Sequence, residues 1–474
     1  MKHFFTLIFL IVFCLSSTVL SAAPEKLNYQ QMPAFTLHKK ESGTGNTLLV
    51  IGGIQGDEPG GFSAASLLAT HYTIKSGNVW IVPNLNFASI IHSSRGLHGD
   101  MNRKFAKLSP KDPEYETVRN IQEIILNPQV DLVLNMHDGS GYYRPKWENS
   151  LKNPQRWGQC IVIDQEKIDD DVVQNPRFQD LVAIANNVKD DVNVKLLRYL
   201  HSYRIKNTTT KNFDKEMEKS LSYFAVCAGK AAFGIEASKE LPAASRVYYH
   251  VCLLEAFMRE MGIEFERNFH LSPNGVAMAL NENISISLFN KRTVFSLNNA
   301  RSTTRGYIPV QKGAALVAEP SNPLLAVLPH DNEPWSVVYG NRTLTRFTPE
   351  YLNFDTSIEK INLLIDGKQT VVNIGDMIKV NSSFIIQGED GYRVNAIGAV
   401  QEVNGSEADV ELKYEHFAKR FSLDQAGYVY RVEFYKDSDF CGMLLVNFGP
   451  DKKPALPKIP LTAGNGPIKS NLGK

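Results

Sequence analysis

The feature that most restricts the fold of this chain is the alternation of short apolar runs with helical patterns between residues 45 and 262. Near-continuous apolar strands are buried on both faces, as in parallel sheets that helices cover on both sides. The expected strands are Thr47–Ile54, Val79–Pro83, Asp131–Met136, Gln159–Ile163 and Ala231–Ile235, and the expected helices are Gly61–His71, Glu114–Leu126, Asp180–Lys189 and Arg246–Met261. The pattern predicts an α/β fold with a mostly parallel sheet.

Past about residue 265 the helical periodicity fades, and short β-branched runs separated by turns replace it. One of them contains Asp366-Gly367, a dipeptide typical of a tight β-hairpin. We therefore expect two small all-β domains behind the α/β domain. The expected division is 24–265 for the α/β domain, 266–346 for a β-barrel-like domain, 347–451 for an Ig-like β-sandwich and 452–474 for a flexible tail.

The N-terminus has the features of a secretory signal peptide. A basic start at Lys2 is followed by an uncharged run, Phe4 to Leu20, and by the small residues Ser21-Ala22-Ala23. We expect residues 1–22 to be removed on export, and no stable membrane insertion afterwards, because no later run is long and apolar enough to span a bilayer. The 51 Lys and Arg nearly balance the 50 Asp and Glu, so overall charge gives no attraction to nucleic acid.

Polar residues cluster where three of the expected strands end. A Gly-rich loop with Gln55 and Glu58 follows the first strand, His137 follows Met136, and Glu236 follows Ile235. In an open α/β sheet, ligands bind outside the carboxyl ends of the strands. Each residue alone is also compatible with a structural role, as a turn residue, a helix start or a strand end. Their shared location favours a single metal site.

These residues, together with Arg95 and Asp100-Met101-Asn102-Arg103, resemble the zinc carboxypeptidase family over roughly residues 45 to 262. In that family the first loop reads His-x-x-Glu, whereas this chain has glutamine at position 55. A neutral amide oxygen is a weaker donor to zinc than an imidazole. A subgroup of periplasmic peptidoglycan carboxypeptidases that determine helical cell shape carries the same glutamine and two β modules behind the catalytic domain. The resemblance implies one Zn²⁺ per chain, bound by Gln55, Glu58 and His137.

The resemblance also implies roles for the remaining residues. Glu236 matches the general base, and Arg95 matches the arginine that stabilises charge on the scissile carbonyl oxygen. Asn102 and Arg103 match the pair that binds the terminal carboxylate of the substrate. The implied activity is removal of terminal meso-diaminopimelate from the tripeptide stem of peptidoglycan to leave a dipeptide. The implied location is the periplasm.

Two other functions are compatible with the same sequence. Deacylases that release small acyl groups from amino acids, of the aspartoacylase and succinylglutamate desuccinylase type, use a similar Gly-Asp-Glu-Pro-Gly loop, but they usually lack paired β modules and an export signal. Alternatively, Gln55 marks a lost metal site, and the chain is a non-catalytic scaffold that binds the cell wall. The sequence leaves open the role of the β domains, the oligomeric state and the tyrosine that closes over the substrate, for which Tyr199, Tyr203 and Tyr223 lie in the right region.

Overall fold

The computed structural model describes residues 35–400 and 405–450, and the expected signal peptide and tail lie outside this part. Within it, the N-terminal half forms one seven-stranded sheet in the order β1-β4-β2-β5-β10-β8-β9. The strands in that order are β1 (His38–Glu41), β4 (Asn78–Val82), β2 (Thr47–Ile51), β5 (Leu132–Gly139), β10 (Ala231–Ser238), β8 (Cys160–Ile163) and β9 (Arg204–Asn207). All neighbours are parallel except β1 with β4 and β10 with β8.

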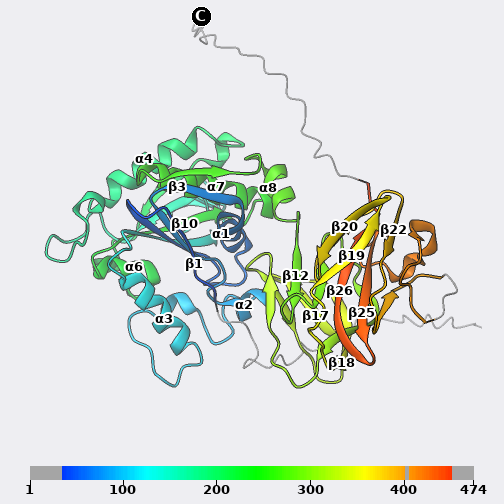
Figure 1. The fold of residues 1–474 in the computed structure, drawn as a ribbon. Helices are drawn as coiled ribbons and strands as arrows, with labels where there is room; N and C mark the ends of the chain where they lie inside the picture. The colour runs from blue at the N-terminus through cyan, green and yellow to red at the C-terminus, as the bar shows by residue number, and fades with distance from the viewer. Residues whose placement is uncertain (1–34, 401–404, 451–474) are drawn as a thin grey trace, which may run out of the picture.

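Helices cover this sheet, as expected (Figure 1). The main ones are α1 (Pro59–His71), α3 (Tyr115–Leu126), α4 (Leu181–Asn193), α6 (Leu221–Cys227) and α7 (Ala243–Glu260), with the shorter α2 (Phe87–Ile91), α5 (Thr210–Phe213) and α8 (Pro273–Ala279). Helix α1 approaches β5 so closely that a Cβ on Gly61 would lie 2.8 Å from the Met136 carbonyl oxygen. The α/β expectation is confirmed, although β5 and β10 extend three residues further than expected.

Several elements of this half have weak sequence signals and were not expected. They are β1 and β9, the short helices, the parallel pair β6 (Tyr142–Tyr143) and β7 (Lys152–Asn153), and the antiparallel pair β3 (Tyr72–Ser76) and β11 (Glu264–Arg267). The strands β1 and β9 lie at the two edges of the large sheet, where one side of each is free. Edge strands are short and partly polar, so they lack the continuous apolar runs of central strands.

The region after α8 contains small sheets, which confirms the expected β architecture. The first group comprises β12 (Ser285–Leu288), β13 (Thr293–Ser296), β14 (Thr303–Gln311), β15 (Ala318–Pro320), β16 (Leu325–Leu328), β17 (Trp335–Tyr339) and β18 (Arg342–Leu352). Its apolar cluster includes Phe62 and Ile90 of the α/β half, so the two regions share a core. The expected boundary between residues 346 and 347 falls inside β18, which runs on to Leu352 in the same sheet.

The second group forms two four-stranded sheets with one shared apolar core. It comprises β19 (Lys360–Ile365), β20 (Lys368–Asn373), β21 (Met377–Lys379), β22 (Ser383–Ile386), β23 (Tyr392–Ala396), β24 (Leu412–Lys413), β25 (Val429–Lys436) and β26 (Asp439–Asn447). The Asp366-Gly367 turn joins β19 to β20, with positive φ at both residues, as the hairpin prediction requires. Within the described ranges, no helix is long and apolar enough to cross a membrane.

Candidate active site

The Gly-rich loop between β2 and α1 carries two of the expected site residues. A Cβ on Gly56 would lie 2.0 Å from the carbonyl group of Ser89, so only glycine fits where the loop presses against residues 89–94. The Gly56 N–H also donates to the Ser94 carbonyl oxygen at 2.9 Å. This packing turns Gln55 and Glu58 inward, and both side chains are buried.

The central strands β5 and β10 supply the other side of the site. On β5, Asp138 accepts hydrogen bonds from the Gly60 N–H of α1 and from Arg246 of α7, so that residue points to the helical face. Successive side chains alternate across a strand, so His137 points to the opposite face. Glu236 pairs directly with His137 in the parallel register of β10 and β5. The three expected strands therefore bring their polar residues to one face.

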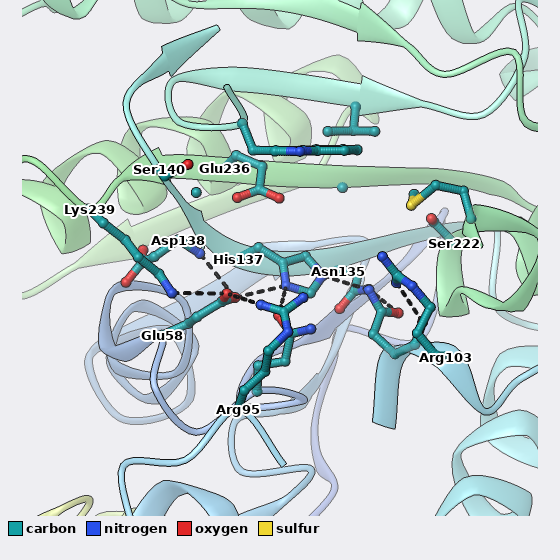
Figure 2. Close-up of a pocket in the computed structure, with 17 residues that line it drawn as sticks. Glu58, Arg95, Arg103, Asn135, His137, Asp138, Ser140, Ser222, Glu236 and Lys239 are labelled. Carbon is teal, nitrogen blue, oxygen red and sulfur yellow. Dashed lines mark hydrogen bonds and ion pairs between the residues drawn. The ribbon is translucent and has the colours of Figure 1, made fainter. Parts of the chain in front are cut away.

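Three donor atoms lie together at this face, and Figure 2 shows two of the side chains that carry them, Glu58 and His137. The Nδ1 atom of His137 lies 3.1 Å from Oε1 of Gln55 and 2.9 Å from Oε2 of Glu58. The described residues contain no cluster of three or more His, Cys, Asp or Glu side chains that could hold a metal ion. A metal site here therefore requires the amide oxygen of Gln55 as its third donor. One nitrogen and two oxygen donors suit a borderline divalent cation.

The orientation of the Gln55 amide is fixed by Asp100. The Gln55 Nε2 group donates to Oδ1 of Asp100 at 2.7 Å, and Arg95 Nε donates to the other oxygen at 3.1 Å. Burial opposes ionisation of Asp100, but the hydrogen bond from Gln55 and the charge of Arg95 outweigh it and lower the pKa. A carboxylate only accepts hydrogen bonds, so it holds the amide nitrogen and leaves the amide oxygen facing His137. Asp100 belongs to the Asp100-Met101-Asn102-Arg103 motif, but no local sequence pattern predicts this role for it.

Glu236 is buried directly beside the three converging donors. Burial raises the pKa of this carboxyl well above its ordinary value, and the carboxylates of Glu58 and Asp138 raise it further. Its Oε2 atom has no hydrogen-bond partner among the described residues. Such an unpaired buried oxygen is costly unless it has a function, and it is suited to accept a proton.

Arg95 and Arg103 lie across the same pocket from Glu236 (Figure 2), and Asn102 also lines this pocket. Arg95 Nη1 lies 3.4 Å from Oε1 of Glu58, and its side chain is half-exposed. The Asn102 amide oxygen accepts from the Leu221 N–H at 3.0 Å, and the Asn102 carbonyl oxygen accepts from Arg103 Nη1 at 2.9 Å. All seven expected site residues therefore line one cavity of about 340 Å³.

The structure adds a lysine that sequence reasoning missed. Lys239 Nζ lies 3.0 Å from Asp57 and 3.5 Å from Oε1 of Glu58. The two cations Lys239 and Arg95 thus face Oε1 of Glu58, while Oε2 faces His137. The only sequence signal for Lys239 is its position three residues after Glu236. Of the tyrosines left open, Tyr203 is fully buried and donates to Gln159, which excludes it as a closing residue.

Comparison with known proteins gives matches over most of the chain. Residues 5–281 match the family described as carboxypeptidase controlling helical cell shape, catalytic, and residues 354–449 match the C-terminal domain of metallo-carboxypeptidase. No curated protein matches the chain. The α/β half is thus matched as a catalytic region, and the last β region is matched as a C-terminal domain of a metallo-carboxypeptidase.

Solved structures of Csd4, a cell shape determinant of Helicobacter pylori, are similar to the chain. The tripeptide-bound form is 38% identical, with a TM-score of 0.79, and the match covers 88% of this chain and 100% of that one. The form bound to mDAP, described as a D,L-carboxypeptidase, is 39% identical, with a TM-score of 0.79 and coverage of 87% and 100%. A glutamine-to-histidine variant is 38% identical, with a TM-score of 0.78 and the same coverage. The chain therefore belongs to the family of metallo-carboxypeptidases that control helical cell shape.

Proposed function

We propose that the chain is a periplasmic zinc D,L-carboxypeptidase that removes terminal meso-diaminopimelate from the tripeptide stem of peptidoglycan, leaves a dipeptide and thereby affects cell shape. The main support is the convergence of Gln55, Glu58 and His137 beside the unpaired carboxyl of Glu236. The ligands named for the Helicobacter pylori protein, a tripeptide and mDAP, support the substrate.

Gln55, Glu58 and His137 would hold one zinc ion per chain. The donor set fits, because zinc accepts imidazole nitrogen and carboxylate oxygen, and Asp100 presents the weaker amide oxygen in a fixed orientation. A zinc ion held by these residues would supply Lewis-acid chemistry to the scissile carbonyl group and to the attacking water. The chain's own residues provide the remaining chemistry.

Glu236 takes the proton from the attacking water and passes it to the leaving amine. Its raised pKa suits this exchange, since a carboxyl with a pKa nearer neutrality can both accept and release the proton. Arg95 is held by Asp100 and reaches the pocket, where its guanidinium stabilises negative charge that develops on the carbonyl oxygen. Its fixed position means that little reorganisation is needed during the reaction.

Asn102 and Arg103 bind the terminal carboxylate of the substrate. The guanidinium of Arg103 offers a planar, two-pronged fit to a carboxylate, and its ion-pair contact with Glu216 is long, at 4.0 Å. Asn102 is buried beside His137, so the carboxylate is fixed at a set distance from the reacting bond. Recognition of a chain end in this way makes the enzyme an exopeptidase.

The test is incubation of the zinc-loaded full-length protein with purified muropeptides that carry tripeptide stems. We expect release of free diaminopimelate and accumulation of dipeptide stems, measured by chromatography and mass spectrometry. Unchanged tripeptides in the presence of bound zinc would overturn the proposal. Hydrolysis of short N-acyl amino acids instead would support the deacylase alternative. A protein that takes up no zinc even when zinc is in excess, and that binds wall material without hydrolysing it, would support the scaffold.

A further inference from the structure

Two segments beside the pocket concentrate positive charge, although the whole chain is nearly neutral. Residues 142–157 contain four basic side chains and one acidic side chain, and residues 195–211 contain five basic side chains and no acidic one. We call these two segments the basic rim. A local excess of one charge sign attracts an oppositely charged partner, regardless of the overall balance.

The two segments of the basic rim are packed against each other. The Arg144 guanidinium donates to the carbonyl oxygens of Leu200 at 2.8 Å and Ser202 at 3.2 Å. In the other direction, Lys206 Nζ donates to the Pro154 carbonyl oxygen at 2.7 Å. These bonds cross from one segment to the other, so the rim is a single surface that is ordered before any partner binds.

Much of the positive charge on the rim is uncompensated. Five of its cations have no carboxylate within ion-pair distance in the described part of the chain; they are Lys146, Arg156, Arg198, Arg204 and Lys206. Burial lowers the pKa of Arg144, and the neighbouring charge of Arg204 lowers it further, which reflects the crowding of like charges. Such crowding is unfavourable in the free protein and would be relieved by an anionic partner.

The rim also exposes large aromatic side chains. Trp147 is 63% exposed and Tyr199 is 86% exposed, whereas aromatic residues of this size are usually packed. Aromatic and cationic side chains together form the centre of many binding surfaces. Flat aromatic faces pack against the apolar faces of sugar rings, and arginine and lysine pair with carboxylates.

The rim begins where the pocket ends. Trp157 lines the pocket, and Lys206 Nζ lies 4.2 Å from the centre of its ring. A polymer whose end group occupies the pocket would therefore extend over the rim. The tripeptide stem carries more carboxylates than amines, so the polymer is anionic at neutral pH.

We propose that the basic rim docks the peptidoglycan sacculus, pairing its cations with the carboxylates of neighbouring stems and its exposed aromatic side chains with the glycan strand. This inference rests on the proposed function, because it takes the substrate to be part of that polymer. Docking raises the effective concentration of stem ends at the pocket without changing the chemistry there. The rim would thus favour intact wall over released fragments.

The test reverses two rim charges whose side chains make no hydrogen bond in the described structure. Lys146→Glu with Arg198→Glu is compared with Lys360→Glu and Lys368→Glu, an exposed pair on the C-terminal sandwich that changes net charge equally. Co-sedimentation with purified sacculi is measured for wild type and both double variants, together with kcat/KM on soluble tripeptide. We expect the rim variant to bind sacculi about tenfold more weakly, with a reduced salt dependence, and the control to match wild type.

The two measurements separate this inference from the proposed function. Soluble tripeptide should be cleaved equally by all three proteins. If none of them cleaves it, the proposed function is refuted, but binding of sacculi by the basic rim is not. Equal sacculus binding by both double variants would overturn the proposal that the basic rim docks the sacculus. Binding of wild type to phosphatidylglycerol vesicles as tightly as to sacculi would also overturn it, since the rim would then be a general anion-binding surface. Trp147→Ala with Tyr199→Ala should weaken sacculus binding while leaving its salt dependence unchanged.

Discussion

Two buried glutamates, one in the α/β half and one in the C-terminal sandwich, have opposite surroundings. Glu236 on β10 and Glu433 on β25 are both buried, and burial raises the pKa of both. The Oε1 atom of Glu433 forms an ion pair with Arg431 Nε at 2.8 Å, without hydrogen-bond geometry, and its Oε2 accepts from the Tyr435 hydroxyl at 2.8 Å. Glu236 forms no ion pair among the described residues; the carboxylates of Glu58 and Asp138 raise its pKa more than Lys239 and Arg95 lower it, and its Oε2 has no hydrogen-bond partner.

The difference shows that burial of a charged group does not by itself identify a functional site. In the sandwich a cation and a phenol compensate the carboxylate, as expected where the group only contributes to the fold. In the α/β half, Glu236 has no ion-pair partner among the described residues, Lys239 and Arg95 offset its burial only in part, and a cavity lies beside the carboxyl. Burying the carboxyl of Glu236 without a counter-ion lowers stability. Such a cost at a cavity that a ligand can enter indicates a function for this carboxyl.

The largest effect that follows from this comparison is expected for Glu236→Gln. The amide keeps the size of the side chain but cannot accept the proton, so kcat should fall by about 10³-fold. Stability should stay the same or increase, because an unpaired buried carboxyl is removed. The measurement is hydrolysis of soluble tripeptide together with denaturant unfolding.

Glu433→Gln is the matched variant in the other region. It leaves Arg431 buried without its counter-ion, which should lower the free energy of unfolding by about 3 kcal/mol while kcat below the unfolding transition stays unchanged. An equal loss of activity in the two variants, or destabilisation by Glu236→Gln, would show that the two glutamates do not differ as described.

The sequence predicts the α/β half and its site well because both depend on local patterns. The strands that carry His137 and Glu236 are apolar and central, so their positions are predictable, and parallel pairing then brings their ends together. The contact between Gln55 and Asp100 was not predicted, because it joins side chains 45 residues apart whose orientations are set by two loops. Local patterns contain no information on such orientations.

The β region shows the same limit for strands. β14 and β18 were not expected, and they form a parallel pair in which Thr303 lies opposite Arg346 and Gln311 opposite Leu352. Both strands alternate polar and apolar residues irregularly and depend on long-range pairing, so neither has a distinct local signal. We propose that the division between the two β regions lies after Leu352 rather than at residue 347.

A smaller effect is expected from Asp100→Asn, which tests whether Asp100 orients the Gln55 metal donor. The new amide can donate to the Gln55 amide as well as accept from it, so the orientation of Gln55 is no longer fixed. Zinc affinity should fall by about 10- to 100-fold, measured by competition with a chromophoric chelator, whereas wild type retains about one zinc per chain. Unchanged affinity in Asp100→Asn would show that Asp100 does not orient the ligand.

Gln55→His should bind zinc more tightly than wild type in the same measurement, since imidazole is the better donor.

The smallest effect concerns pH and uses metal-free protein, so that only the carboxyl groups matter. Because the pKa of Glu236 is raised in the folded state, the native protein keeps this proton at pH values where the unfolded chain has lost it. The stabilising contribution of the protonated form is therefore complete below the ordinary glutamate pKa and is lost as pH rises to the folded pKa. Glu236→Gln lacks this titration, so its advantage in free energy of unfolding over wild type should grow as pH rises above about 4.5. Denaturant unfolding of both proteins in chelator across this range measures the difference. If the free energies of unfolding of the two proteins change with pH in parallel, Glu236 has the same pKa in the folded and unfolded states. The difference between Glu236 and Glu433 would then rest on their contacts alone.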